Sequence, residues 1–172
     1  MFSHTELAEI MRNAALDVFT TMLSQTPTAG EAYRETSAAL STNGVVSLVG
    51  LAGTWVGTGS IACTAQCACW IAGHMMAAEY EAVDDEVLDA MAEVTNMIIG
   101  NVKTVLEERL GAMGLSIPTV IYGRNFTSRA VGNQEWTVVP FTAGGENLSI
   151  QLCLVPSRAG ARPRCGFVQE TV

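Results

Sequence analysis

The strongest candidates for a functional role in this sequence are two polar residues with helical spacing. Glu93 and Asn96 are three positions apart, so they project from neighbouring turns on one face of a helix. Asp89, Gly100 and Lys103 continue that face at steps of four and three residues. Gly100 has no side chain one turn beyond Asn96, so a partner molecule could approach closely there. These residues therefore predict a face of the helix that binds a partner molecule.

Asn96 and Gly100 are poor helix formers in the interior of a well-formed helix. Asn favours caps and turns, and an interior Gly costs about 1 kcal/mol relative to Ala. A helix gains nothing locally from either residue. A functional face explains their presence, and the alternative is a solvated face on which they are incidental.

Two further groups of residues resemble functional motifs. Cys63, Cys67 and Cys69 lack the paired C-x-x-C spacing of zinc sites, so we interpret them as small core residues. Gly57 and Gly59 begin a pattern like part of a dinucleotide-binding fingerprint, but they precede a strand rather than a helix, so we interpret them as turn residues.

An acidic segment precedes Asn96 and contains no basic residue. Seven of the 17 acidic residues fall within it: Glu79, Glu81, Asp84, Asp85, Glu86, Asp89 and Glu93. A divalent cation could bind there, but acidic residues at a helix start more commonly complement the helix dipole. We expect no metal site.

Composition limits the classes of protein to which the chain can belong. Its 172 residues fit one domain, and 49% of them are hydrophobic, which supplies a core. The net charge is −8 and Lys103 is the only lysine, which argues against nucleic-acid binding. Neither a membrane-spanning run nor a signal segment is visible, so we expect a cytoplasmic protein without membrane contact.

Three helices are predicted. The first begins at the capping-box residues Ser3 and Glu6 and ends near Ser24. A short helix covers about 66–78, and a long one covers about 84–110, with Asp84 or Asp85 as its cap and Gly111 at its end. Residues at helical spacing should pack the long helix on a sheet: Val87, Met91, Val94, Ile98, Val102 and Val105.

The remaining segments predict a sheet. Strands are expected over 45–53, 57–64, 118–123, 136–141 and 148–154, whereas 31–43 is ambiguous between strand and loop. The fold class is therefore α+β, an antiparallel or mixed sheet with two long helices and a shorter one packed on it. A single domain should cover 1–155, followed by a tail at 156–172 that carries Arg158, Arg162 and Arg164.

The long helix and the strand after it resemble a known family. The stretches 85–104, with Glu93 and Asn96, and 115–123 are similar to the signature region of the CheX branch of the CheC/CheX/FliY phosphatases. Residues 49–53, 57–60 and 138–141 resemble other strands of that family. The resemblance extends over roughly residues 4–155 and implies the CheC/CheX-like fold.

The resemblance also implies an activity. Family members dephosphorylate the aspartyl phosphate of a CheY-like receiver domain. By this resemblance, the amide of Asn96 orients the attacking water and Glu93 pairs with the receiver's lysine. Asp89, Gly100 and Lys103, which continue the same face by their spacing, are predicted to be partner-binding residues. The receiver supplies Mg²⁺, so the chain needs no cofactor of its own. Phosphoryl transfer depends mainly on positioning and charge balance, which an amide that holds water can supply.

Assembly and activity leave alternatives open. Glu9 and Asn13 are four residues apart in the first helix, which breaks the E-x-x-N spacing and predicts one site per chain. The resemblance implies a homodimer, formed by joining sheets or packing helices. The main alternative function is a catalytically silent module that binds a receiver or another signalling partner without turnover, because fold alone does not fix function. A weaker alternative is a purely structural dimer protein.

Overall fold

The computed structural model of the chain describes residues 2–36, 40–128 and 135–157. Three helices, α1 His4–Met22, α2 Ala65–Met76 and α3 Asp85–Leu110, combine with eight strands. The strands are β1 Thr28–Ala29, β2 Tyr33–Glu35, β3 Leu40–Gly53, β4 Trp55–Thr64, β5 Met113–Leu115, β6 Thr119–Ser128, β7 Trp136–Ala143 and β8 Glu146–Pro156. The arginines of the predicted tail, Arg158, Arg162 and Arg164, lie outside the described residues.

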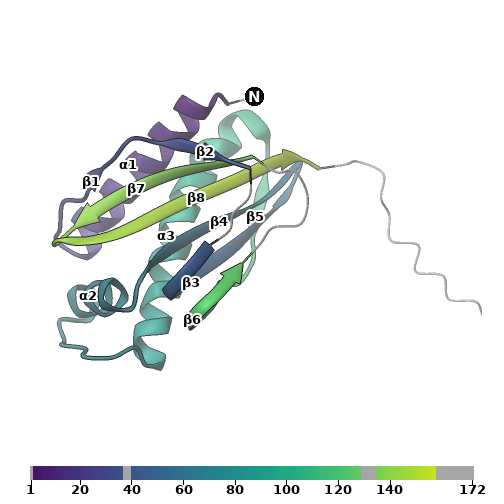
Figure 1. Cartoon of the computed structure of the whole chain (residues 1–172). Helices are drawn as coiled ribbons and strands as arrows, with labels where there is room; N and C mark the ends of the chain where they lie inside the picture. Colours follow the sequence, from purple (N-terminus) through teal and green to yellow (C-terminus); the bar gives the residue numbers. More distant parts are fainter. Residues whose placement is uncertain (1, 37–39, 129–134, 158–172) are drawn as a thin grey trace, which may run out of the picture.

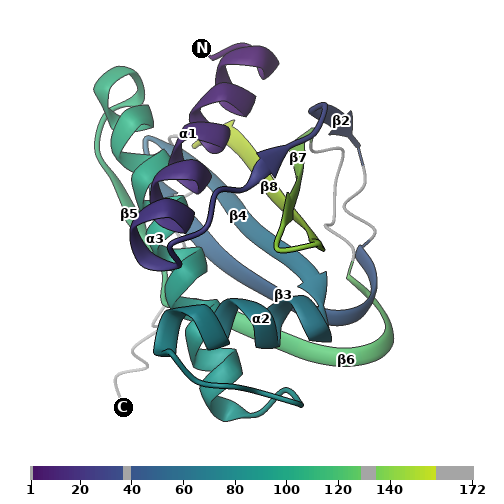
Figure 2. The ribbon, with the colours of Figure 1, turned by 90° about the vertical axis from the view of Figure 1, so that its left-hand side faces the viewer.

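The strands form one antiparallel sheet. Its order is β1-β7-β8-β4-β3-β5, with β2 also paired to β7 and β6 also paired to β3. The helices lie on one face of this sheet, with α3 running beside α1 (Figures 1 and 2). This arrangement confirms the predicted α+β fold with two long helices and a shorter one. The ambiguous segment resolves into β2 and the beginning of β3.

Side-chain caps fix where the long helices begin. Ser3 Oγ accepts a hydrogen bond from the Glu6 N–H at 3.2 Å, and Glu6 Oε2 accepts one from the Ser3 N–H at 2.7 Å. Asp84 Oδ1 accepts a 3.0 Å hydrogen bond from the Val87 N–H and so caps α3. Gly111 ends α3 with a φ of 82°, a conformation that glycine adopts without strain. The capping-box prediction is confirmed.

The core lies between the helices and the sheet. The predicted inner residues of α3 are buried except Val105, which is 41% exposed. The prediction for Val105 is wrong because the buried row continues from Val102 by a step of four to Leu106, which is fully buried. The three clustered cysteines, Cys63, Cys67 and Cys69, are buried, as predicted for core residues.

Gly57 and Gly59 are not turn residues, so that prediction is wrong. Both lie inside β4, which pairs with β3 on one side and β8 on the other. A Cβ atom on Gly59 would lie 2.5 Å from Cδ1 of Ile99, a residue of α3. A Cβ atom on Gly57 would collide with the carbonyl oxygen of Cys153. The absence of a side chain at Gly59 therefore lets Ile99 of α3 pack directly against β4.

Candidate functional site

Glu93 and Asn96 lie on the outer side of α3, as the helical spacing predicts. Glu93 is exposed and Asn96 is half-buried, whereas Val94 and Thr95 between them are fully buried. The Thr95 hydroxyl donates a 2.7 Å hydrogen bond to the carbonyl of Met91, so this inner residue is internally satisfied. The two polar side chains therefore project from a turn whose inner half is fixed in the core.

Neither polar side chain is engaged within the described part of the chain. Glu93 and Asn96 make no hydrogen bond or ion pair with any residue in 2–36, 40–128 or 135–157. The amide of Asn96 thus keeps two N–H donors and a carbonyl acceptor, and Glu93 keeps a carboxylate. The pair can accept and donate hydrogen bonds to a molecule that docks on this face.

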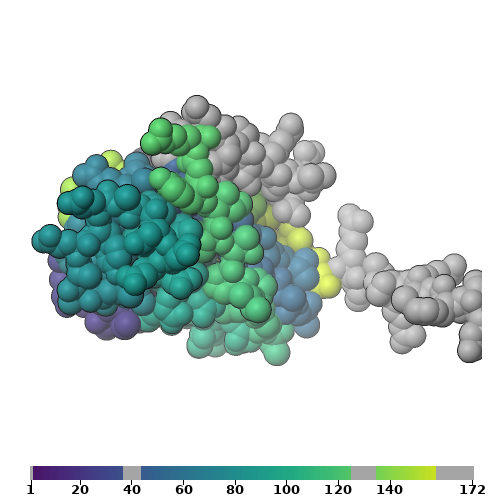
Figure 3. All heavy atoms as spheres, turned by 90° about the horizontal axis from the view of Figure 1, so that it is seen from below, coloured from purple at the N-terminus to yellow at the C-terminus, as the bar shows by residue number. Residues whose placement is uncertain are grey.

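Asp89 lines a shallow hollow beside the site. The hollow has a volume of about 460 Å³ and lies between α3 and the start of β6. Its lining residues are Asp85, Leu88, Asp89, Ala92, Pro118 and Val120. Viewed from below, the segment that carries β6 (green) lies against the surface formed by α2 and α3 (teal) in Figure 3. Sequence reasoning identified Asp89 but missed the opposite wall, because no local pattern indicates that Pro118 and Val120 flank α3.

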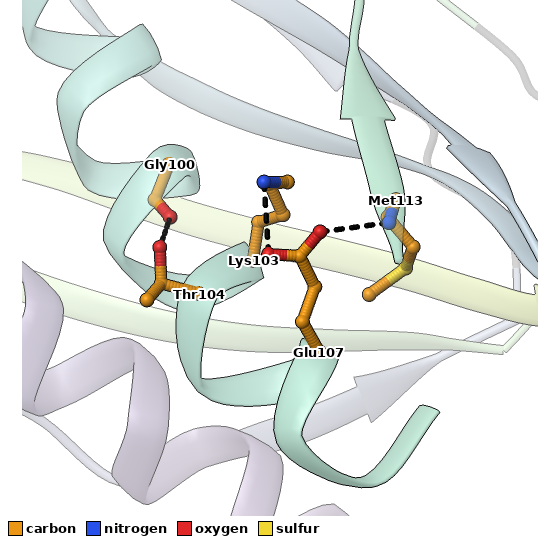
Figure 4. Close-up of polar contacts among 5 residues, drawn as sticks. All are labelled: Gly100, Lys103, Thr104, Glu107 and Met113. Atoms are coloured by element: carbon orange, nitrogen blue, oxygen red, sulfur yellow. Dashed lines mark hydrogen bonds and ion pairs between the residues drawn. The ribbon is translucent and has the colours of Figure 1, made fainter. Parts of the chain in front are cut away.

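Gly100 is half-buried and faces β5 rather than open solvent alone. A Cβ atom built on it would lie 3.7 Å from Cδ1 of Leu115, an ordinary van der Waals contact. Its carbonyl accepts a 3.0 Å hydrogen bond from the Thr104 hydroxyl (Figure 4). Leu115 therefore limits the approach to Gly100 from one side.

Lys103 is held by an ion pair inside the chain. Its Nζ lies 2.9 Å from Glu107 Oε2, and Glu107 Oε1 accepts a 2.8 Å hydrogen bond from the Met113 N–H (Figure 4). The Met113 hydrogen bond, followed by the Lys103 ammonium, lowers the pKa of Glu107. The five predicted site residues thus follow one face of α3, but the cation at its end is directed towards Glu107.

The arrangement of Glu93 and Asn96 is suited to positioning a docked molecule. The described residues contain no group of three or more His, Cys, Asp or Glu side chains able to hold a metal ion. The amide of the half-buried Asn96 can orient a water molecule, and the exposed carboxylate of Glu93 can pair with a cation. None of the described helices is long and apolar enough to cross a membrane.

Comparisons with known proteins indicate the family and the fold. A sequence model of the chemotaxis phosphatase CheX family matches residues 45–142, more than half of the chain. The structure of a chemotaxis protein CheX from Desulfovibrio desulfuricans is 28% identical, with a TM-score of 0.77, and the alignment covers 87% of this chain and 99% of that one.

A second relative has been solved in a complex. The chain is 28% identical to a structure of a CheX–CheY–BeF3–Mg complex from Borrelia burgdorferi, with a TM-score of 0.72 and coverage of 85% and 96%. The structure of Thermotoga maritima FliY shares the fold. It is 18% identical to this chain, with a TM-score of 0.62, and the alignment covers 88% of this chain and 87% of that one. No curated protein sequence is significantly similar to the chain.

Proposed function

The chain belongs to the CheX family of chemotaxis phosphatases, and we propose that it hydrolyses the aspartyl phosphate of a CheY-like receiver domain. The support from comparison is the related CheX structure solved with CheY, BeF3 and magnesium, 96% of whose chain aligns with this one. The observation on this chain that carries the proposal is the pair Glu93 and Asn96. Within the part of the chain that the structure describes, these polar side chains have no hydrogen-bond or ion-pair partner, and they lie on adjacent turns of a helix whose inner face is fixed in the core.

In this proposal, Asn96 acts by orientation. Its amide enters the receiver's site and holds a water molecule in line with the phosphorus atom. The amide cannot remove a proton efficiently, so its contribution is positioning, which is a large part of what phosphoryl transfer requires. The half-burial of Asn96 favours this role, because a side chain with restricted freedom loses less entropy when it orders a water molecule.

Glu93 supplies the docking contact. Its exposed carboxylate pairs with the lysine of the receiver and fixes the orientation in which Asn96 meets the phosphoryl group. Asp89 and Gly100 flank this contact on the same face. Lys103 contributes at the edge of the interface, where its ammonium is shared with Glu107. The receiver supplies the Mg²⁺ that neutralises the phosphoryl oxygens, so this chain adds no cofactor.

The proposal is tested by following phosphate release from a phosphorylated CheY-like receiver. Asn96→Ala should lower the rate constant at saturating receiver on the order of a hundredfold, the size of loss expected when a reacting water is misplaced. Asn13→Ala is the matched control, because Asn13 is an exposed helical asparagine on α1. Full activity of Asn96→Ala would overturn the mechanism, and loss of activity in Asn13→Ala would contradict a single site per chain.

Measuring receiver binding and phosphate release on the same samples distinguishes a phosphatase from a catalytically silent binding module. A phosphatase accelerates phosphate release above the receiver's own rate, and Glu93→Gln weakens binding. A silent module binds the activated receiver but leaves its phosphate lifetime unchanged.

We propose further that the chain forms a homodimer through β6. Among the described strands, β6 pairs only with β3, so its ten-residue outer edge carries unpaired backbone groups that a second copy can complete. Sedimentation over a concentration series measures the assembly state. A single monomeric species at all concentrations would refute the dimer.

A further inference from the structure

The surface beside Asn96 has an apolar wall that the proposed mechanism does not use. Ile117, between β5 and β6, is 89% exposed, the highest value among the large apolar residues described. Pro118 follows it and lines the hollow next to α3. Single exposed apolar residues are common on protein surfaces. This one merits explanation because of where it lies relative to the site.

The segment that carries Ile117 runs antiparallel along α3. At one end, Leu115 lies beside Gly100, and at the other, Pro118 shares the hollow with Ala92. The eight residues from Ala92 to Gly100 span about 12 Å of helix. The three steps from Leu115 to Pro118 span about 10 Å of extended chain. The two stretches therefore match in length and lie side by side.

Asn96 stands halfway along the helical stretch, and Ile117 stands inside the extended one. The segment that carries Ile117 therefore passes the stretch of helix that carries Asn96. Asn96 is half-buried on this stretch, whereas Glu93, three residues earlier, is exposed.

The other wall of the hollow is acidic. Asp85 and Asp89 are exposed and follow one another at a step of four, and Glu93 continues the row. No Lys or Arg is among the residues that line this hollow. The surface near Asn96 thus combines a protruding apolar side with a row of negative charge, which is complementary to an apolar side chain flanked by cations.

The size of a standard protein interface indicates whether Asp89 and Ile117 would fall within the contact area of a receiver centred on Asn96. A standard protein interface covers about 800 Å² on each partner, a disc of about 16 Å radius. Asp89 is seven residues from Asn96, which is about 10 Å along the helix. A receiver centred on Asn96 must therefore cover Asp89, and the segment that carries Ile117 lies beside the same stretch of helix.

We infer that Ile117 and Pro118 form an apolar docking wall for the receiver domain, with Asp85 and Asp89 opposite them as an acidic wall. The inference rests on the proposed function and extends it to partner selection. The receivers it selects present an apolar side chain next to lysine or arginine. The apolar wall acts mainly on dissociation, and the acidic wall acts on the association rate and its dependence on salt.

The test measures binding of a beryllofluoride-activated CheY-like receiver separately from turnover. Ile117→Ser should weaken binding about tenfold, the loss typical of an interface anchor, and leave the saturating rate constant and the melting temperature unchanged. Ile117→Leu should bind like the wild type. Leu16→Ser, at a 43% exposed position on α1, is the matched control and should change nothing. Asp85→Asn with Asp89→Asn should flatten the dependence of the association rate on ionic strength.

Wild-type binding by Ile117→Ser, or an unchanged salt dependence in the double aspartate variant, would overturn the docking wall. Failure of the proposed function gives a different pattern. If the wild type binds the receiver and Ile117→Ser weakens that binding, but phosphate release is never accelerated, the docking surface stands and the phosphatase activity does not.

Discussion

The carboxylate of Glu107 accepts a 2.8 Å hydrogen bond from the backbone N–H of Met113, which fastens the end of α3 to β5. Because β5 leads directly into the segment that flanks Asn96, this contact sets the position of one wall of the site relative to the other. The ion pair of Glu107 with Lys103 orients the same carboxylate. The relationship connects the stability of the helix end to the geometry of the candidate site.

Removing the hydrogen bond between Glu107 and Met113 should reduce the rigidity of the candidate site, although neither residue belongs to it. We expect Glu107→Ala to lower the melting temperature and to weaken receiver binding, with a smaller loss of saturating rate constant than Asn96→Ala. Glu108→Ala is the control, because Glu108 is the exposed neighbour on the same turn. Thermal unfolding and binding titrations check both effects. Equal behaviour of the two glutamate variants would show that the Met113 hydrogen bond does not position the site.

The close approach of α3 to the sheet gives a second prediction. Gly59→Ala places a Cβ atom 2.5 Å from Cδ1 of Ile99, so the helix or the strand must shift. Overpacking of this kind costs about 1–3 kcal/mol of unfolding free energy. Gly114→Ala in β5 is the control, because its Cβ atom would lie no closer than 3.8 Å to any other group. Urea denaturation measures the difference, and equal stabilities would contradict the packing argument.

The charge of Glu6 should make stability depend on pH in a defined range. The hydrogen bond from the Ser3 N–H, followed by the Arg109 side chain, lowers the pKa of Glu6 from 4.5 to about 2. A carboxyl group whose pKa is lower in the folded state than in the unfolded state stabilises the folded protein at pH values above the unfolded-state pKa. That stabilisation is lost as the pH falls towards and through the folded-state pKa.

The wild type should therefore melt at a higher temperature than Glu6→Gln near neutral pH. The difference should decrease between pH 4.5 and pH 2, the interval between the unfolded and folded pKa values. Melting curves over this range, with Glu9→Gln as a control on the same helix, check the sign. A difference that stays constant down to pH 2 would show that the Glu6 charge is not responsible.

Local signals in the sequence predicted the helices and the face of α3 well. Capping residues such as Ser3 and Asp84 act within one turn, so their positions are visible in sequence. The role of Gly59 depends on Ile99, 40 positions later. The pairing of Lys103 with Glu107 competes with the partner contact that the helical spacing predicted for Lys103. Contacts between distant segments decide these features, and one sequence alone does not contain them.

Gly100 offers a test in which stability and binding should change in opposite directions. A Cβ atom there meets only Leu115, at 3.7 Å, and Ala is the better helix former, so Gly100→Ala should stabilise the chain by about 0.5–1 kcal/mol. If the receiver approaches the open side of Gly100, the added methyl group should weaken receiver binding in the stabilised protein. Urea denaturation and binding titrations of one preparation measure both quantities. A more stable variant that binds like the wild type would remove Gly100 from the interface and leave Glu93 and Asn96 as the contacts to be explained.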